Sequence, residues 1–505
     1  MPVEEIRRLV KCYGDAAEAL KGAGFDGVFL HFGHGLQVAQ FLSPLTNKRT
    51  DEFGGSLENR ARYPMMAIDA IRERVGRDML IEVRISGTEV EEGGFGLEEA
   101  IAFTDMIQDK IDMIQVSCGV HNPKYMTVVH PCGFLPPIPN VYLAEAFKKS
   151  GRIRIPVVTI GGIQDLDEAE QILADGRADI LAIARGIIAD TDLVNKAYAG
   201  RNDDVTPCIK CMRCLDSGVF GHKYLCAVNP VIGMEHVLPT MIQPAQAKKK
   251  VAVIGGGPAG MEAALTASSR GHNVTLFEKS SSLGGALNFA DHVSFKYPLK
   301  KFKDYLVRQI EKSGVRVRLN TKATPGLIKT GKYDAVYAAI GAKPIVPLMK
   351  GVEAGNAKLA VEIFGREWEL GQRIVVVGGG QVGCETALHL AKLGREVTLV
   401  EMLSELAPDA SPTHRTELLQ ELDKEADLTY VTNNRCNAIT AKGVMCESGP
   451  IEADNVILSV GMTALSEEAE AFRPVTNEFA ALGDCVRPRR VENAIKEAYY
   501  AAVRL

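Results

Sequence analysis

The sequence lacks the features that mark membrane, secreted and nucleic-acid-binding proteins. No uncharged stretch approaches the roughly 18 residues of a membrane span, and the first residues lack the apolar core of a signal peptide. The formal net charge is only -5 and basic runs such as Lys248–Lys250 are short, so the sequence carries no electrostatic footprint for nucleic acid or anionic lipid. We therefore expect a cytoplasmic protein that acts on a small molecule.

The sequence also lacks a disulfide framework. Four of its eleven cysteines fall between residues 208 and 226, and seven are scattered over a chain of 505 residues. Secreted disulfide scaffolds are short chains with cysteines throughout. The crowding of four cysteines instead indicates a metal centre. The length and the 46% hydrophobic content indicate about two to four globular domains.

Residues 1 to about 200 repeat one unit, which consists of an amphipathic helix pattern, a short β-branched run and a polar or glycine-rich loop. This repetition predicts an α/β fold built from successive βα units. Five such strands would not close an eight-stranded barrel. The expected strands are Gly27–His31, Leu80–Ile85, Met113–Ser117, Ile155–Ile160 and Ile180–Ile183.

The carboxy-terminal part contains one pattern twice, with an apolar strand, a glycine-rich turn, a helix and a second strand that ends in glutamate. Glycine lets the backbone approach a pyrophosphate, whose charge then lies at the helix amino terminus, and the glutamate accepts from ribose hydroxyls. A single copy could be a tight turn without a ligand. The matched pair predicts two dinucleotide-binding folds. Their residues are Gly255, Gly257, Gly260 and Glu278 in the first copy, and Gly378, Gly380, Gly383 and Glu401 in the second.

Glu401 also bears on the choice between NADH and NADPH. Its carboxylate would repel a 2′-phosphate, and Met402–Ser404 supplies no arginine to receive one. The sequence therefore favours NADH over NADPH at the second fold.

Four cysteines form one motif, with three closely spaced and a fourth after eleven intervening residues: Cys208, Cys211, Cys214 and Cys226. Zinc and a cubane iron-sulfur cluster both accept four thiolates. Zinc sites more often use two separated CxxC pairs, and zinc carries no electrons. The spacing beside two nucleotide folds favours [4Fe-4S] over zinc, with incidental thiols as the third alternative.

The paired folds, with Leu283–Gly285, Ala339–Pro344 and Ala481–Asp484, resemble the flavoproteins that have two dinucleotide-binding domains. The resemblance implies that the first fold, including Gly285, holds FAD and that the second holds NAD(H). It also implies that Asp484 binds the ribityl chain of FAD. The disulfide reductases of that group carry a close cysteine pair in this module. Here no CxxC occurs among the carboxy-terminal cysteines, so electrons are expected to leave by another route.

The amino-terminal part is similar to the Old Yellow Enzyme family in five segments: Ala23–Val28, His31–His34, Gln40–Pro44, Asn47–Asp51 and Gly54–Arg60. With the cysteine motif and the paired folds, the resemblance narrows to the multidomain branch of 2,4-dienoyl-CoA reductase, 2-enoate reductase and trimethylamine dehydrogenase. It implies FMN in a (βα)8 barrel and electron transfer from NADH through FAD and the cluster. The implied domains are a partial barrel at 1–205, an iron-sulfur loop and linker at 206–247, an FAD-binding domain at 248–350 plus 465–505, and an NAD(H)-binding domain at 351–464.

The resemblance also implies roles for residues of the barrel. Arg84 would lie near flavin N1 and O2, and His31 and His34 would hold a substrate carbonyl over the flavin. In the amine dehydrogenase of the branch the first of these two positions is aromatic, so His31 favours an unsaturated carbonyl over an amine. The implied phosphate pocket consists of Gly161, Gly162, Ala184 and Arg185.

Two departures from the family pattern concern chemistry and completeness. Many ene-reductases have a proton-donating tyrosine where this chain has Leu36, so His121 is the expected proton donor, with Tyr125 and His130 in the same loop. The strand ending at His31 corresponds to the fourth of the barrel, and strands one to three are not in the sequence. Three explanations would account for this gap: an amino-terminal truncation, a partner chain that completes the barrel, or a changed role of the remaining strands. A homo-oligomer is a separate open alternative.

The sequence thus predicts an NADH-dependent ene-reductase that acts on an α,β-unsaturated acid, enoyl thioester or enone. Two alternatives stay open at this point. One is an amine dehydrogenase of the trimethylamine type. The other is an NADH-fed electron-transfer subunit or an inactive fragment, in which the incomplete barrel binds no FMN.

Overall fold

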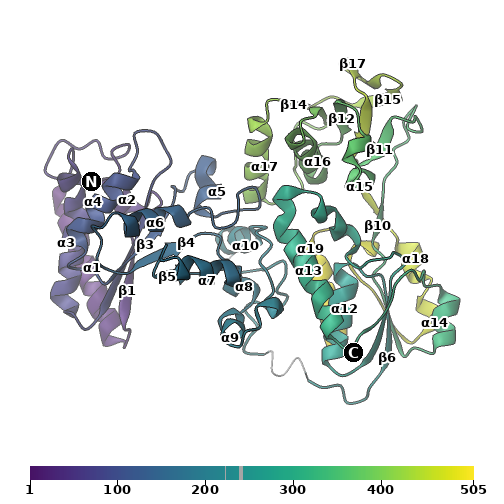
Figure 1. The fold of residues 1–505 in the computed structure, drawn as a ribbon, viewed down its shortest axis with the longest axis horizontal. Coiled ribbons are helices and arrows are strands. Elements are labelled where there is room, and N and C mark those ends of the chain that lie inside the picture. The colour runs from purple at the N-terminus through teal and green to yellow at the C-terminus, as the bar shows by residue number, and fades with distance from the viewer. Residues whose placement is uncertain (222, 238–242) are drawn as a thin grey trace. The chain divides into compact units, whose positions relative to one another are not determined.

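The computed structural model describes residues 1–221, 223–237 and 243–505, and the chain forms two compact units, 1–185 and 186–505 (Figure 1). The linker expected at Pro239–Ala247 lies partly outside the described residues. Within them, no helix is both long and apolar enough to cross a bilayer.

The first unit contains five parallel strands in the order β1-β2-β3-β4-β5. All five predicted strands are present, with ends within two residues of those expected, and they form the carboxy-terminal part of a (βα)8 barrel. The strands are β1 (Gly27–His31), β2 (Leu80–Ser86), β3 (Met113–Ser117), β4 (Val157–Ile160) and β5 (Ile180–Ala182). The helices are α1 (Val3–Gly22), α2 (Gln37–Leu42), α3 (Leu57–Val75), α4 (Leu97–Ile107), α5 (Met126–Val129), α6 (Val141–Lys149) and α7 (Leu166–Ala174), with α8 (Arg185–Ala189) at the junction.

Alternation along β2 separates the packed face of this sheet from the face that carries polar groups. Ile81, Val83 and Ile85 are fully buried in a core that includes α1 and α3, which pack side by side (Figure 1). Because successive side chains of a strand point to opposite faces, Glu82 and Arg84 point to the other face. Arg84 is in register with its neighbours on β1 and β3, so polar side chains gather at one level of the sheet.

The second unit contains two parallel five-stranded sheets of similar construction. Their central strands, β6 and β12, are the apolar runs before the two glycine-rich turns. The first sheet has the order β20-β9-β6-β7-β8, with bounds Glu478–Ala481, Ala335–Ala338, Lys250–Ile254, Asn273–Phe277 and Arg316–Arg318. The second has the order β11-β18-β12-β13-β14, with bounds Ala357–Leu359, Asn455–Leu458, Arg373–Val377, Glu396–Val400 and Leu428–Val431.

Short strands join and cover the two sheets. The antiparallel pair β10 (Ala342–Pro344) and β19 (Met462–Ala464) forms where the chain leaves the first sheet and returns to it. A three-stranded antiparallel sheet packs on the second parallel sheet; its strands are β15 (Cys436–Thr440), β16 (Gly443–Cys446) and β17 (Gly449–Glu452).

Helices α12, α13 and α19 cover one face of the first sheet, and α14 lies on the other (Figure 1). Helix α16 packs on the second sheet. Among the described residues of this unit, the helices are α9 (Leu193–Tyr198), α10 (Arg213–Gly221), α12 (Pro258–Ser269), α13 (Tyr297–Lys312), α14 (Pro325–Gly331), α15 (Ala360–Ile363), α16 (Gln381–Lys392), α17 (Pro412–Lys424), α18 (Ser466–Glu470) and α19 (Val491–Val503).

Candidate functional site

Hydrogen bonds through His34 hold the carboxyl ends of β1, β2 and β3 together. The His34 N–H donates to Ser86 Oγ at 3.0 Å, and the His34 carbonyl accepts from the His121 N–H at 3.0 Å. Ser86 Oγ donates in turn to the Gly119 carbonyl at 2.7 Å. His34 has a left-handed backbone conformation, with φ 58°, which is uncommon for a residue with a side chain. These bonds hold that conformation and fix where the imidazole lies.

Four histidine rings form a row at these strand ends. Ring centroids lie 4.8 Å apart for His31 and His34, 5.2 Å for His34 and His121, and 5.8 Å for His121 and His130. His34 is 2% exposed, whereas His121 is exposed. The structure therefore brings the three predicted catalytic histidines together, and the row joins a buried imidazole to one that meets solvent.

Arg84 lies beside this row with unused hydrogen-bonding capacity. Its Nη2 donates to Ser117 Oγ at 3.0 Å, while its Nε is buried and has no hydrogen-bond partner. Gln115 Oε1, in register with Arg84 on the next strand, is also buried without a partner. Burial lowers the pKa of Arg84 to about 10. Because buried polar atoms are nearly always paired, this donor set fits a polar ligand such as the carbonyl and ring-nitrogen edge of a flavin.

Hydrogen bonds assign the protons of His31 and His34. The Gly33 N–H donates to His31 Nδ1 at 3.3 Å, so neutral His31 carries its proton on Nε2. Ser117 Oγ lies 2.7 Å from His34 Nε2 and already accepts from Arg84. We assign the Ser117 hydroxyl as the donor to His34 Nε2, which leaves the His34 proton on Nδ1. Each imidazole then retains one N–H for a ligand.

The same surroundings keep all four imidazoles neutral. Burial, together with the charge of Arg84, lowers the pKa of His34 to about 2 and the pKa of His31 to about 4. Burial and the nearby arginines lower the pKa of His130 to about 3. Burial and Arg84 also lower the pKa of the more exposed His121. At neutral pH the row donates hydrogen bonds without adding positive charge.

The four residues of the predicted phosphate pocket follow two neighbouring strands. Gly161 and Gly162 come after β4, Ala184 and Arg185 come soon after β5, and these parallel strands end at the same edge. Gly161 and Gly162 have φ values of 130° and 76°, which glycine adopts without strain. A Cβ on Gly161 would lie 2.7 Å from Asn140 Nδ2. The loop thus requires glycine at position 161, and it follows a strand end at the edge where barrels bind phosphate.

Sequence reasoning missed Ser86 and Ser117, which both orient His34; Ser117 also accepts from Arg84. Both residues end a strand, and they are in register with each other. Their position at the carboxyl ends of β2 and β3 was the available signal, because catalytic residues of a barrel gather there. Leu36 is 40% exposed and has no side-chain donor, whereas Tyr125 is buried in the loop that carries His121.

In each glycine-rich turn, the first and last glycines are required by packing, whereas the middle one leaves room for a ligand. A Cβ on Gly255 would collide with the Ala339 carbonyl, and a Cβ on Gly260 would collide with the Gly255 carbonyl. Gly378 and Gly383 are crowded in the same way in the second copy. Near Gly257, by contrast, the closest atom to a Cβ would be the Gly285 Cα at 3.9 Å. The first and last glycines are therefore required by the fold, and the middle one leaves space that fits a pyrophosphate.

Both predicted ribose-binding glutamates hold the glycine turn of their own fold. Glu278 Oε2 accepts from the Gly256 N–H at 2.7 Å, and Glu401 Oε2 accepts from the Gly379 N–H at 2.5 Å. Both carboxylates are buried. Asp484 accepts from the Arg489 N–H at 3.0 Å, and burial raises its pKa. The glutamates thus position the turn in addition to any ribose contact.

The four cysteines of the motif lie near one another. Burial raises the pKa of Cys211, and the charges of Cys208, Cys226 and Cys214 add to that effect. The Lys210 N–H donates to Cys208 Sγ at 3.4 Å. Lys210 and Met212, which alternate with these cysteines, have φ values of 51° and 59°, so the backbone winds tightly between the thiols. A backbone donor to sulfur on such a loop is a feature of iron-sulfur sites.

The chemistry of this donor set bears on which metal group it fits. Four thiolates are donors that both zinc and a cubane iron-sulfur cluster accept. Zinc carries no electrons, whereas this cysteine segment shares a core with a nucleotide-binding fold. In this setting the donor set fits [4Fe-4S] better than zinc.

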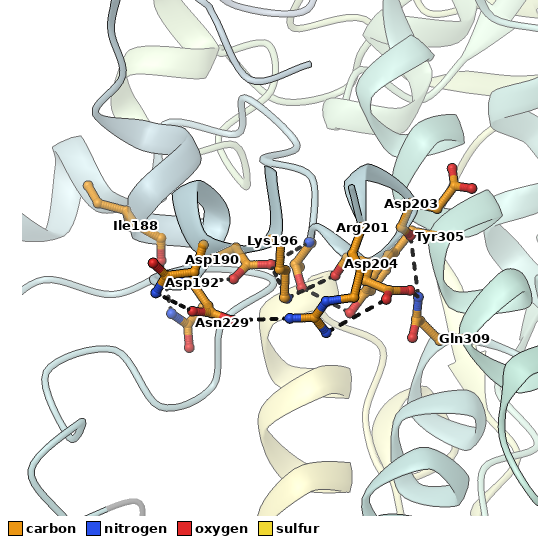
Figure 2. Close-up of polar contacts among 12 residues, drawn as sticks. Ile188, Asp190, Asp192, Lys196, Arg201, Asp203, Asp204, Asn229, Tyr305 and Gln309 are labelled. Carbon is orange, nitrogen blue, oxygen red and sulfur yellow. Dashed lines mark hydrogen bonds and ion pairs between the residues drawn. The ribbon is translucent and has the colours of Figure 1, made fainter. Parts of the chain in front are cut away.

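Hydrogen bonds and an ion pair hold both ends of the cysteine segment, which runs from Cys208 to Cys226. Asp190 accepts from the Lys196 ammonium at 2.6 Å and from the Thr206 N–H at 2.8 Å, and Thr206 Oγ1 donates to Tyr305 at 3.0 Å. Beyond Cys226, the Asn229 amide donates to the Ile188 carbonyl at 2.9 Å (Figure 2). These contacts fix the segment just before its first cysteine and just after its last.

The cysteine segment also packs into the core of the first nucleotide fold. Cys226 belongs to the same apolar cluster as Val251 on β6 and Ala259 at the glycine-rich turn. Arg213 Nε donates to Glu492 on α19 at 2.5 Å, and Lys210 Nζ donates to Tyr297 on α13 at 2.5 Å. The cysteine site and the first nucleotide site therefore belong to one compact unit and share its core.

Cys436 and Cys446 form a pair that their sequence spacing conceals. They face each other across β15 and β16, with the two Sγ atoms 3.1 Å apart. Burial raises the pKa of both thiols. Protonated thiols are poor nucleophiles, so this pair is unlike the reactive cysteines of disulfide reductases. It does not change the expectation that electrons use another route.

Family models match both units. Residues 1–204 match the "NADH:flavin oxidoreductase / NADH oxidase family", and residues 249–498 match "Pyridine nucleotide-disulphide oxidoreductase". The chain is 37% identical to an NADH oxidase of Thermoanaerobacter brockii over 99% of this chain and 78% of the relative. It is 30% identical to a cinnamate reductase of Clostridium sporogenes, with 99% and 78% covered.

A solved structure is similar over the whole chain. The complex of 2-naphthoyl-CoA reductase with 2-naphthoyl-CoA superposes with a TM-score of 0.94 and 34% identity. The superposition covers 100% of this chain and 77% of that one.

We expect Ser86→Ala to destabilise the contacts between β1, β2 and β3 near the histidine row, so that these strands open more often. The change leaves the buried His34 N–H and Gly119 carbonyl without their partner, which costs about 1–3 kcal/mol. Hydrogen exchange measured by mass spectrometry should show peptides 27–35 and 113–121 opening roughly 5- to 100-fold more often. Ser150→Ala, at a helix end of the same unit, serves as the control. Unchanged exchange in those peptides would contradict the fastening role.

We expect the histidine row to stay neutral in mild acid and to make the fold acid-sensitive. Because the pKa values of His31, His34 and His130 lie below the ordinary 6.5, the folded state binds fewer protons than the unfolded state. Stability should therefore fall as pH drops from about 6.5 toward 4. NMR of chain labelled at histidine Cε1 should show at least these three rings still neutral at about pH 5. Ten rings that all titrate above pH 6 would contradict the assignment.

Proposed function

Because the chain belongs to the multidomain branch of the Old Yellow Enzyme family, we propose that it is an NADH-dependent ene-reductase that reduces the C=C bond of an α,β-unsaturated acid, enoyl thioester or enone. One observation carries the proposal, namely the row of neutral histidines with defined N–H donors beside the buried Arg84. The names of the relatives support it, since they include reductases of cinnamate and of 2-naphthoyl-CoA.

In this proposal His31 and His34 hold the substrate carbonyl oxygen. His31 Nε2–H and His34 Nδ1–H are the two donors left free by the protein's own contacts. Negative charge grows on that oxygen when the β-carbon accepts hydride, and fixed donors stabilise it more than they stabilise the neutral ground state. Ser117 and Gly33 keep the two protons on the required nitrogens.

The proton for the α-carbon comes, in this proposal, from His121, the member of the row that is exposed to solvent. Leu36 has no donor, whereas His121 lies 5.2 Å from His34 between ring centroids and is exposed to solvent. Neutral His121 can pass its N–H proton to the basic α-carbon of the enolate while its other ring nitrogen takes a proton from water, which leaves the ring neutral and a hydroxide in the solvent. His121 is therefore the proposed proton donor, and His130 stacks on it.

The remaining assignments concern cofactors. We propose that Arg84, Gly161, Gly162, Ala184 and Arg185 hold FMN; that the first fold with Asp484 holds FAD; that the second fold holds NADH; and that the four-cysteine motif holds [4Fe-4S]. When bound, these groups supply the hydride for the β-carbon and the electrons that replace it. Glu401, near any ribose, disfavours NADPH. The proposed domains are 1–205, 206–247, 248–350 with 465–505, and 351–464.

The amine dehydrogenase alternative is less well supported. A substrate ammonium would lie near the buried cation of Arg84, and the nearest row of side chains offers N–H donors, which an ammonium does not need. A carbonyl oxygen, by contrast, is stabilised by a nearby positive charge and by N–H donors. The histidine row therefore favours the unsaturated carbonyl.

Cofactor analysis separates the ene-reductase from an electron-transfer subunit. Acid extraction of the purified chain should give about one FMN per FAD, and iron analysis about four atoms per chain. Cys226→Ser should lose iron while Cys12→Ser, at an exposed and isolated cysteine, keeps it. FAD without FMN would favour the electron-transfer subunit, and zinc in place of iron would exclude the cluster.

We expect His34→Ala to uncouple substrate reduction from flavin reduction. Loss of one donor to a developing oxyanion should lower turnover of cinnamate or an enone about 100- to 1,000-fold. Anaerobic mixing with NADH should still bleach the flavins at the rate of the unmodified protein. His236→Ala, at an exposed histidine of the other unit, is the control. Full turnover in His34→Ala would exclude the carbonyl-holding role.

A further inference from the structure

We propose that Asp409 sets how tightly the second nucleotide fold binds its dinucleotide, by occupying the backbone amide that a pyrophosphate would use. The inference rests on the proposed assignment of that fold to NAD(H). It concerns a residue outside the glycine motif, in the loop between β13 and α17.

The two nucleotide folds provide an internal comparison, because the same loop crosses the glycine turn in each. In the first fold Leu283 packs on Gly256, and the Gly284 N–H donates to the Gly256 carbonyl at 2.9 Å. In the second fold Leu406 packs on Gly379, and the Ala407 N–H donates to the Gly379 carbonyl at 2.7 Å. The correspondence is residue by residue, so Leu283–Ala286 matches Leu406–Asp409.

The loops differ at the position that faces the helix. In the first fold this position is Ala286, and the helix begins with Pro258, which has no N–H to offer. In the second fold Asp409 Oδ1 accepts from the Gln381 N–H, the first amide of α16, at 2.8 Å. The same carboxylate oxygen lies 3.5 Å from where a Cβ of Gly380 would be. An anionic side chain thus lies where the charge of a pyrophosphate is favoured.

The contact opposes a dinucleotide in two ways. A carboxylate at a helix amino terminus is itself stabilised by the N–H groups, and this stabilisation is lost when the ligand displaces it. A carboxylate that stays would repel the pyrophosphate. Asp409 is exposed, so water screens both effects and the side chain can rotate away. The Asp409 backbone stays in place because its carbonyl accepts from Arg490 at 2.6 Å.

This difference between the folds matches what each is proposed to do. A flavin must stay bound through many turnovers, and the first fold has no acidic group at Ala286. A nicotinamide dinucleotide must enter and leave at each turnover, and the second fold carries Asp409. We therefore assign Asp409 as the residue that keeps NAD(H) exchangeable.

The test compares dinucleotide affinities of the full-length, flavin-loaded chain by titration calorimetry. The ligands are NADH and ADP-ribose, which has the pyrophosphate but no nicotinamide. Asp409→Asn, which removes the charge, should lower the Kd for both ligands about three- to tenfold, and Asp409→Ala should do so at least as strongly. Asp427→Asn, at an exposed aspartate of the same fold, should leave both unchanged. The gain should shrink at high salt.

A reciprocal variant tests the comparison itself. Ala286→Asp should weaken FAD retention, measured as flavin released on dialysis, without changing ADP-ribose affinity. Unchanged or weaker binding of both ligands by Asp409→Asn would overturn the proposal, and so would a chain in which neither the unmodified protein nor the variant binds ADP-ribose. Because ADP-ribose binding needs no ene-reduction, failure of the proposed reaction would leave these outcomes readable.

Discussion

The buried positive charge of Arg84 is the constraint on which the candidate site of the first unit depends. Its guanidinium has one fixed partner, Ser117, and a buried nitrogen without any. Burial and this charge together keep His31 and His34 neutral, which is the state in which each offers a single N–H. The charge also favours the binding of a negatively charged group at this face of the sheet. A site that carries positive charge before its cofactor binds can stabilise the reduced, anionic form of that cofactor.

The two nucleotide folds show how one architecture serves two purposes. Their first and last glycines are fixed by collisions with the protein's own carbonyl groups, so these positions are constrained whether or not a ligand binds. The glutamates likewise hold their own turns. Only the residues around the middle glycine, such as Gly285 and Asp409, are free to differ between the copies. Ligand behaviour is therefore set by the crossing loop more than by the glycine motif.

Local sequence patterns predicted the strands and the repeated turns well, because β-branched runs and strand-to-helix glycines are determined by neighbouring residues. The roles predicted for the histidines and for the phosphate-pocket residues came from the family resemblance, and the structure brings the histidines into one row. Contacts between distant segments were not readable. Ser86 and Ser117 look like ordinary strand-end serines until the parallel register pairs them. Cys436 and Cys446 are separated by nine intervening residues instead of the two of a CxxC pattern, yet a hairpin makes them neighbours.

The packing of the cysteine segment into the first nucleotide fold has a consequence for electron transfer. Cys226, Val251 and Ala259 share one core, and Arg213 and Lys210 add polar ties to the helices of that fold. The spacing between a cluster held by the cysteines and a flavin held by the glycine turn would therefore be set by side-chain packing within one compact unit. Tunnelling rates depend steeply on distance. In the proposed electron path, the rate of this step thus depends on how that core is packed.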